Sequence, residues 1–214
     1  MKLANLKIGK RLALGYGVIC AMLVVMIVMS NAMLGRINAG TDEIVNNRMP
    51  RIELTNRMQA EINDIAIALR NMMLTDEEGD RRRQVNDIMA SRQSMDGILA
   101  ELKGMLSNPR AAALLAEMEK ETALYKAGQD GMIKHIQAGE MDEARAMLGE
   151  QLRPLLMRLK KATADQTALQ KEIAGQAALD AEATYRSTSL LMWGLGAAAL
   201  ALAALVAWRI TRSI

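Results

Sequence analysis

Arginines near the ends of predicted helices are the residues of this sequence best suited to binding a ligand. Arg70 and Asn71 lie near the end of the first of four predicted helices, Arg92 lies in the second, and Glu150 and Arg153 lie near the start of the fourth. A guanidinium recognises a planar carboxylate through paired hydrogen bonds. We therefore expect these side chains to approach one distal ligand pocket. The alternative is that they form salt bridges between helices with some of the many acids.

Residue patterns typical of catalysis or metal binding are missing from the sequence. His135 is the only histidine and Cys20 the only cysteine, so the chain cannot form an internal disulfide. There is no glycine-rich phosphate loop and no cluster with metal-ligand spacing. The 18 methionines fall mostly in apolar stripes and runs, where they are expected to fill cores. We expect no enzyme activity, no catalytic residue, no metal and no cofactor.

The elements that hold these residues are predicted from the distribution of charge. Hydrophobic residues make up 51% of the chain, yet all 24 acidic residues lie between Asp42 and Glu182. Long apolar runs occupy the two ends that lack acids. Ala, Leu, Met, Glu, Arg and Lys dominate and Phe is absent, which favours helices over strands. An all-α membrane protein is therefore predicted.

Two apolar runs are long enough to cross a bilayer, which needs about 20 helical residues. Residues 12–34 are free of charge and predict a first transmembrane helix, with a cleaved signal peptide as the alternative. Residues 190–208 predict a second one, and a buried core helix is a weak alternative because the run is apolar on every face.

Basic residues beside the runs predict the orientation. Four precede the first span and two follow the second, so the tails at 1–11 and 209–214 are expected in the cytoplasm. Tyr185, Trp193, Trp208 and Arg209 are predicted membrane anchors, with lipid as their partner. The outer segment, residues 35–189, has 21 basic and 24 acidic side chains. The basic balance of the whole chain is therefore no sign of nucleic-acid binding.

Turn signals divide the outer segment into four helices. They lie at residues 75–80, 107–109 and 138–140. Asn108 before Pro109 predicts a helix start, Thr75 with Glu78 resembles a capping box, and Pro50 and Pro154 are candidate kinks. Apolar residues recur at alternating intervals of three and four. Their predicted stripes are Met58, Ile62, Ile65, Leu69 and Met72; Val85, Ile88, Met95, Leu99, Leu102 and Leu106, with Arg92 in one register position; Ala111, Leu115, Met118, Thr122, Tyr125, Gln129, Met132 and Ile136; and Leu148, Leu152, Leu155, Leu159, Ala162, Gln166, Leu169 and Ile173.

Short connections and four stripes predict an up-down-up-down four-helix bundle flanked by two transmembrane helices. The first and fourth helices of the bundle continue without a break signal into the two spans. A small shift at the distal end is then carried mechanically through the membrane. Such an arrangement favours a sensor.

Several segments, in order and spacing, resemble the sensory region of bacterial methyl-accepting chemotaxis proteins. They are LKIGKRLALGYG, EIVNNRMPRIELTNRM, IALRNMMLTD, GEMDEARAML with LRP after it, and AWRITRSI, whose end looks like the entrance of a HAMP linker. The likeness covers essentially the whole chain. It implies a homodimer in the inner membrane, a periplasmic ligand-binding bundle, and signalling by displacement of the fourth helix and second span.

In that family the signal passes through HAMP to a cytoplasmic region that controls a histidine kinase. Those parts are missing here, so the chain is expected to be a fragment or a truncated relative that reaches the chemotaxis kinase complex only through an absent cytoplasmic region. The ligand does not carry over. Amino-acid receptors of the family hold a carboxylate with three arginines, and only Arg70 matches, because Glu61 and Ala66 occupy the other two places.

Three alternatives remain open on the residues alone. The module belongs to a chemoreceptor, to a membrane histidine kinase or cyclic-dinucleotide enzyme, or to a structural membrane bundle that does not sense. For a sensor, the expected partner is a small molecule or a periplasmic binding protein.

Overall fold

A computed structural model describes residues 8–212 of the chain, all of which lie in helices or in short connections between them. The described residues form two compact units. Residues 44–175 make one, and the residues up to Glu43 together with those from Gln176 onward make the other. The predicted all-α class is confirmed, and no strand occurs in the described range.

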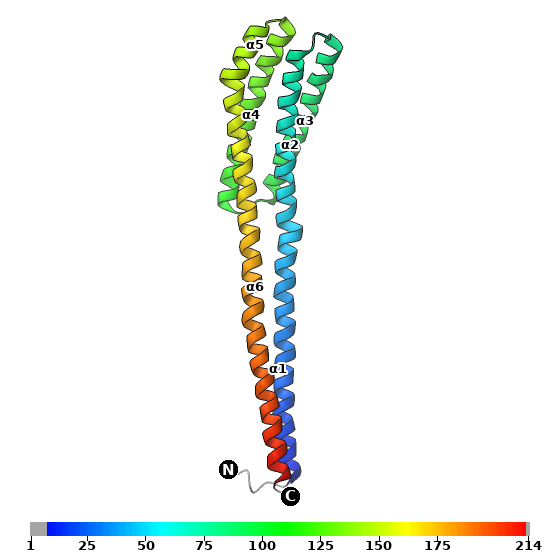
Figure 1. Ribbon diagram of the computed structural model, residues 1–214, viewed down its shortest axis with the longest axis vertical. Helices are drawn as coiled ribbons and strands as arrows, with labels where there is room; N and C mark the ends of the chain where they lie inside the picture. The colour runs from blue at the N-terminus through cyan, green and yellow to red at the C-terminus, as the bar shows by residue number, and fades with distance from the viewer. Residues whose placement is uncertain (1–7, 213–214) are drawn as a thin grey trace. The chain divides into compact units, whose positions relative to one another are not determined.

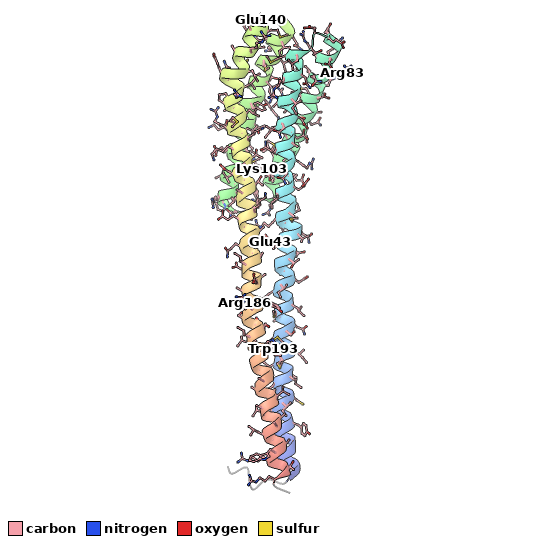
Figure 2. The ribbon with its side chains drawn as sticks, in the orientation of Figure 1. Glu43, Arg83, Lys103, Glu140, Arg186 and Trp193 are labelled. Atoms are coloured by element: carbon pink, nitrogen blue, oxygen red, sulfur yellow. The ribbon has the colours of Figure 1, made fainter. Side chains whose placement is uncertain are left out.

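The unit at 44–175 is a four-helix bundle. Helices α2 (Met49–Leu74), α3 (Glu78–Met105) and α4 (Pro109–Ala138) are followed by α5 (Met141–Met147), a π-helical turn at Leu148–Leu152 and the first part of α6 (Arg153–Thr211). These segments lie side by side in Figure 1. Arg83 and Glu140 lie at one end of the bundle and Lys103 lies toward the other (Figure 2). The up-down-up-down order predicted from the short connections is confirmed.

The bundle core follows the predicted stripes closely. Every predicted stripe residue of α2 and of α4 is buried, including the polar Thr122 and Gln129. Val85 and Leu106, at the ends of the α3 stripe, are only partly buried. The core is therefore continuous through the bundle, and each of α2, α3, α4 and α6 contributes at least two buried polar residues to it.

Local chemistry sets the ends of the helices. The Asn108 side-chain oxygen accepts hydrogen bonds from the backbone N–H groups of Arg110 (2.9 Å) and Ala111 (3.4 Å), so the predicted helix start is confirmed. The capping box is wrong. Thr75 ends α2, Glu77 precedes α3, and the Thr75 hydroxyl accepts from the Glu77 N–H at 3.3 Å. The hydroxyl stabilises the short connection and not the first turn of α3.

Pro50 and Pro154 do not end their helices, because a wider turn precedes each of them. The π-helical turns are Glu43–Arg48 and Leu148–Leu152, and each stops two residues before a proline. A proline has no N–H to donate and its ring crowds the carbonyl four residues earlier. A π turn changes the local hydrogen-bond register and makes room for the ring. The helix is therefore locally widened before each proline, and the kinks expected at Pro50 and Pro154 stay a prediction.

The second unit pairs α1 (Ile8–Asp42) with the later part of α6. Both helices contain stretches apolar and long enough to cross a membrane, and the most apolar stretches are not buried in protein. A Cβ atom added at Gly15 would lie 2.7 Å from Val206 Cγ1, so the two helices approach closely there. Tyr185, Trp193 and Trp208 are exposed, and the Arg212 guanidinium lies 5.4 Å from the Trp208 ring centroid. The limits predicted for the spans, 12–34 and 190–208, stay a prediction.

Candidate functional site

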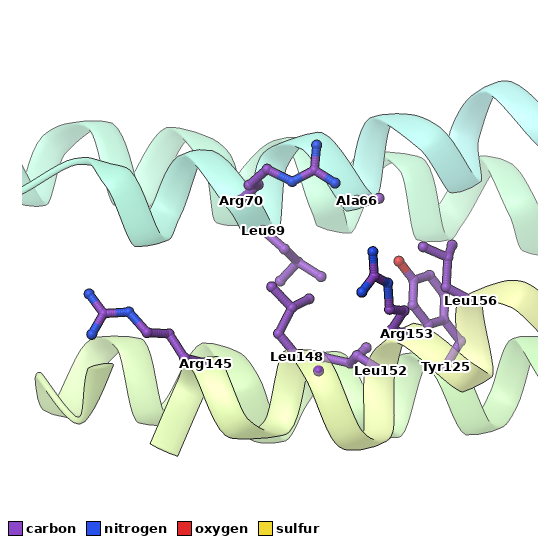
Figure 3. A pocket seen from close by; sticks show the side chains of 10 residues that line it. Ala66, Leu69, Arg70, Tyr125, Arg145, Leu148, Leu152, Arg153 and Leu156 are labelled. Atoms are coloured by element: carbon purple, nitrogen blue, oxygen red, sulfur yellow. The ribbon is translucent and has the colours of Figure 1, made fainter. Parts of the chain in front are cut away.

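A cavity of about 320 Å³ opens near the distal end of the bundle, where α2, α4 and the π-helical turn before α6 meet (Figure 3). Its volume lies at the lower end of the range of about 300 to 1,000 Å³ that is usual for small-molecule pockets. Four of its lining side chains are polar: Arg70, Tyr125, Arg145 and Arg153. The cavity thus gathers three guanidinium groups, and none of its described lining residues is acidic.

The remaining walls are apolar. They are formed by Ala66, Leu69, Leu148, Leu152 and Leu156, with Gly149 in the π-helical turn. Gly128 on α4 lets this side of the pocket pack closely, because a Cβ atom there would lie 3.4 Å from both Leu152 Cδ2 and Leu155 Cδ1. Leu69 and Leu152 are buried core residues, so the walls are anchored in the bundle core.

Arg70 and Arg153 carry charges that the protein leaves unneutralised. Among the described residues, neither guanidinium has a hydrogen-bond or ion-pair partner. Arg145 differs, because its Nη1 lies 2.7 Å from Asp142 Oδ1. In Figure 3, Arg145 also extends away from the other polar side chains, whereas Arg153 extends into the space between α2 and α6 and Arg70 runs along α2 toward Ala66. Arg70 and Arg153 are the cations available to a ligand.

Tyr125 supplies a hydroxyl at the same cavity. The residue is only 1% exposed, and its hydroxyl has no hydrogen-bond partner within residues 8–212. Burial raises the pKa of Tyr125 to about 12, although the nearby Arg92 charge acts in the opposite direction. The phenol is therefore protonated at neutral pH and its O–H is available to donate. Figure 3 shows the hydroxyl end directed into the space between α2 and α6.

The structure brings only two of the five predicted ligand residues to this cavity. Arg70 and Arg153 line it, but Asn71, Arg92 and Glu150 do not. Asn71 donates instead to Gln84 Oε1 at 3.4 Å, across the connection between α2 and α3. Glu150 lies exposed in the π-helical turn beside Gly149, which does line the cavity.

Arg92 has a structural role, which was the alternative considered for these arginines. Its Nε donates to Gln129 Oε1 at 2.7 Å, its Nη1 lies 2.7 Å from Asp130 Oδ1, and its Nη2 donates to the Lys126 carbonyl at 3.1 Å. All three nitrogens are thus engaged by α4. The side chain joins α3 to α4 and is occupied before any ligand arrives.

Comparison with known protein families identifies a family with this four-helix architecture. A family described as a four-helix bundle sensory module for signal transduction matches residues 5–185. The chain belongs to this family of sensory modules. Comparison with curated proteins found no match to the chain. The family is a signalling one, so the distal cavity of this sensory module is the natural candidate for a ligand site.

Sequence reasoning missed two polar residues of the sensory module's cavity. The sequence pattern predicts Tyr125 in the core stripe of the third helix, and the residue is indeed buried, but it also lines the cavity. It is the only tyrosine between residues 44 and 175, which was the one available signal. Nothing in the sequence distinguished Arg145 from the other surface arginines.

Other parts of the sensory module offer weaker candidates. A second cavity, of about 500 Å³, lies between α1 and the later part of α6, but no charged residue lines it. Its lining residues all belong to the two helices that contain the candidate membrane spans. Among the described residues, no group of three or more His, Cys, Asp or Glu residues is arranged to hold a metal ion.

Proposed function

We propose that this chain is the sensory and membrane portion of a chemoreceptor. It detects a small ligand outside the inner membrane and passes the signal through the second span to a cytoplasmic HAMP linker and signalling region in chemotaxis. One observation carries the proposal. Arg70 and Arg153, two unpaired cations from different helices, line one cavity at the start of α6, the helix that continues to Thr211.

The route of the signal follows from the position of Arg153. This residue is the first of α6, and the π-helical turn directly before it lines the cavity. A ligand that binds both Arg153 and Arg70 draws the start of α6 toward α2. Since α6 is helical from Arg153 to Thr211, an axial or rotational shift at its start is transmitted along the helix. The second candidate span is part of that helix.

The proposed topology has two spans, with both ends of the chain in the cytoplasm and the bundle in the periplasm. Basic residues beside both apolar runs support it, and the exposed Tyr185, Trp193 and Trp208 suit the headgroup region. Single cysteines placed in a Cys20→Ser background test it. Ala112→Cys in the bundle should react with a membrane-impermeant maleimide in intact spheroplasts. Labelling only after the membrane is opened would contradict the topology.

The proposed active form is a homodimer. Met49, Ile67 and Leu74 are exposed apolar residues of α2 and are spaced by nearly whole numbers of helical turns, so they share one face. A second copy of the chain would cover this face. Oxidative cross-linking through Ile67→Cys, again without Cys20, should give a dimer in membranes, whereas Arg82→Cys on the exposed face of α3 should not.

The experiment that tests sensing is a hybrid receptor. The chain is joined after Ile214 to the HAMP and kinase-control region of a chemotaxis receptor and expressed in cells that lack their own receptors. Kinase output should then change on addition of at least one small metabolite that binds the purified chain. A hybrid that controls the kinase but ignores every bound metabolite would contradict direct sensing.

Two outcomes distinguish the other candidates. A partner binding protein is indicated when the hybrid responds only in the presence of periplasmic extract. A structural role is indicated when no small molecule binds the bundle and the hybrid's output is constant. A histidine kinase or a cyclic-dinucleotide enzyme in place of the chemotaxis region would use the same sensory module, and the residues that follow Ile214 in its gene would identify it.

A further inference from the structure

The distal cavity offers hydrogen-bond donors with no matching acceptors. Arg70 and Arg153 have no partner among the described residues, and neither has the hydroxyl of Tyr125. Tyr125 as a whole is only 1% exposed, and its hydroxyl end is directed into the cavity, so a bound acceptor could take the hydrogen bond that no described protein group takes. The three groups together can bind one carboxylate: two guanidiniums and a phenol that stays protonated.

The described lining residues of the cavity offer no carboxylate to pair with an ammonium. None of its described lining residues is Asp or Glu, and Asp142, the partner of the lining Arg145, is already paired with it. Glu150 lies in the same turn as Gly149 but does not line the cavity. An amino acid would bring its cationic ammonium close to two unpaired guanidiniums. Like charges at such short range repel, so the site disfavours amino acids.

The walls of the cavity favour an apolar body behind the anionic group. Leu69, Leu148, Leu152 and Leu156 line it together with Ala66, and they come from the opposite sides of the bundle. Leu69 and Leu152 are already buried, but an inorganic anion such as phosphate would leave the partly buried Ala66, Leu148 and Leu156 facing water. A small carboxylate with a branched or aryl body would bury them, and burial of apolar surface stabilises the complex.

We propose that the cavity binds a small organic carboxylate that has an apolar body and lacks an ammonium group. Its carboxylate is held by Arg70 and Arg153 with a hydrogen bond from Tyr125, and its body packs against the leucines of α2, the π-helical turn and α6. This inference rests on the proposed sensing function and names the ligand class of the same site. The three donors fix the anionic end and the absence of acids sets the specificity.

The test uses matched probes on the full chain in lipid nanodiscs, with binding measured by isothermal titration calorimetry. One set is 4-methylpentanoate, leucine and 4-methylpentanamide; the other is 3-phenylpropanoate, phenylalanine and 3-phenylpropanamide. Within a set the skeleton is constant and only the charged groups change. The carboxylate should bind at least about tenfold more tightly than the amino acid or the amide, and inorganic phosphate should not compete.

Variants separate this site from binding elsewhere. Arg70→Gln and Arg153→Gln should each weaken carboxylate binding by about tenfold or more, and Tyr125→Phe by a smaller factor, since a neutral donor is worth less than a charged one. Arg110→Gln is the matched control. Arg110 is an exposed arginine of α4 that pairs with Glu172 at 3.5 Å and lies outside the cavity, so affinity should not change.

Three results would overturn the proposal: amino acids that bind as tightly as their ammonium-free analogues, arginine variants with unchanged affinity, or no saturable binding by either carboxylate. The hybrid receptor distinguishes an error in the proposed ligand class from an error in the proposed sensing function. A hybrid that responds to amino acids refutes the ligand class and leaves sensing intact. A hybrid that ignores a carboxylate bound at Arg70 and Arg153 refutes sensing and leaves the ligand class intact.

Discussion

Arg92 Nε lies 2.7 Å from Gln129 Oε1 inside the bundle, and this bond explains why an arginine can occupy a core register position. The side chain is almost fully buried, but its three nitrogens all find acceptors on α4. A buried cation is tolerated when it is paired and hydrogen-bonded. The residue therefore stabilises the packing of α3 on α4. Its positive charge also acts to lower the pKa of Tyr125, against the larger effect of burial.

Replacement of Arg92 by methionine should destabilise the bundle. The variant removes all three hydrogen bonds and leaves the buried Gln129 amide without its donor, a loss of about 2 to 4 kcal/mol in the free energy of unfolding. Chemical denaturation followed by circular dichroism measures it. Arg82→Met, at an exposed arginine of α3, is the control and should change stability by less than about 0.5 kcal/mol.

The ion pair between α4 and α6 should matter more than its surface counterparts. Glu121 is buried, its side chain only 6% exposed, and its Oε2 accepts from Arg158 Nε at 3.0 Å. Arg158→Leu leaves this carboxylate buried without its partner and should cost about 2 to 3 kcal/mol of unfolding free energy. The Glu121→Gln, Arg158→Leu double variant should lose less than the two single losses added together. Strict additivity would show that the two residues are not coupled.

Stability should fall at high pH because of Tyr125. Burial raises its pKa from 10.0 to about 12, so the folded chain holds the phenol proton more tightly than the unfolded chain. The resulting stabilisation, about 2 to 3 kcal/mol, is fully present below pH 10 and is lost as the pH rises through 12. Unfolding free energies measured across this window should show the loss. Tyr125→Phe should remove that component, and an unchanged pH profile in the variant would assign the loss to other groups.

Two glycines should respond to alanine in opposite directions. A Cβ atom at Gly97, within α3, meets no atom within 4 Å, so Gly97→Ala should stabilise the bundle by about 0.5 to 1 kcal/mol. Gly139 ends α4 with φ of 78°, the left-handed region that side chains disfavour. Gly139→Ala should destabilise by about 1 kcal/mol. The melting temperatures of both variants test this prediction, and equal shifts in melting temperature would refute the backbone argument.

The proposed signal requires the second span to have a fixed depth in the membrane. Trp208 is exposed and its ring stacks with the Arg212 guanidinium, at 5.4 Å from the centroid. Trp208→Ala removes this anchor and should shift the span along the membrane normal. The chemical accessibility of a Ser189→Cys reporter, in a Cys20→Ser background, measures the shift. Leu205→Ala in the same background is the control, because it removes an apolar side chain but no interfacial ring. Equal accessibility in both would remove Trp208 from the mechanism.

The sequence by itself determined the helices, their order and the core. Alternation of three and four along the chain forces one apolar face per helix, and short connections after Leu74, Met105 and Ala138 force antiparallel neighbours. Long uncharged runs that have no polar face indicate membrane spans. These properties depend on the local spacing of apolar and charged residues, which can be read directly from the sequence.

Which of the candidate residues meet at the cavity was decided by the tertiary structure. Arg70, Tyr125 and Arg153 come from three helices, and their meeting depends on helix rotation and on the register change of the π-helical turn before Pro154. Arg92 looked equally suited to a ligand, but the acceptors that occupy it lie more than thirty residues along the chain. Whether a charged side chain is free or paired is set by neighbours distant in sequence, and periodicity carries no information about them.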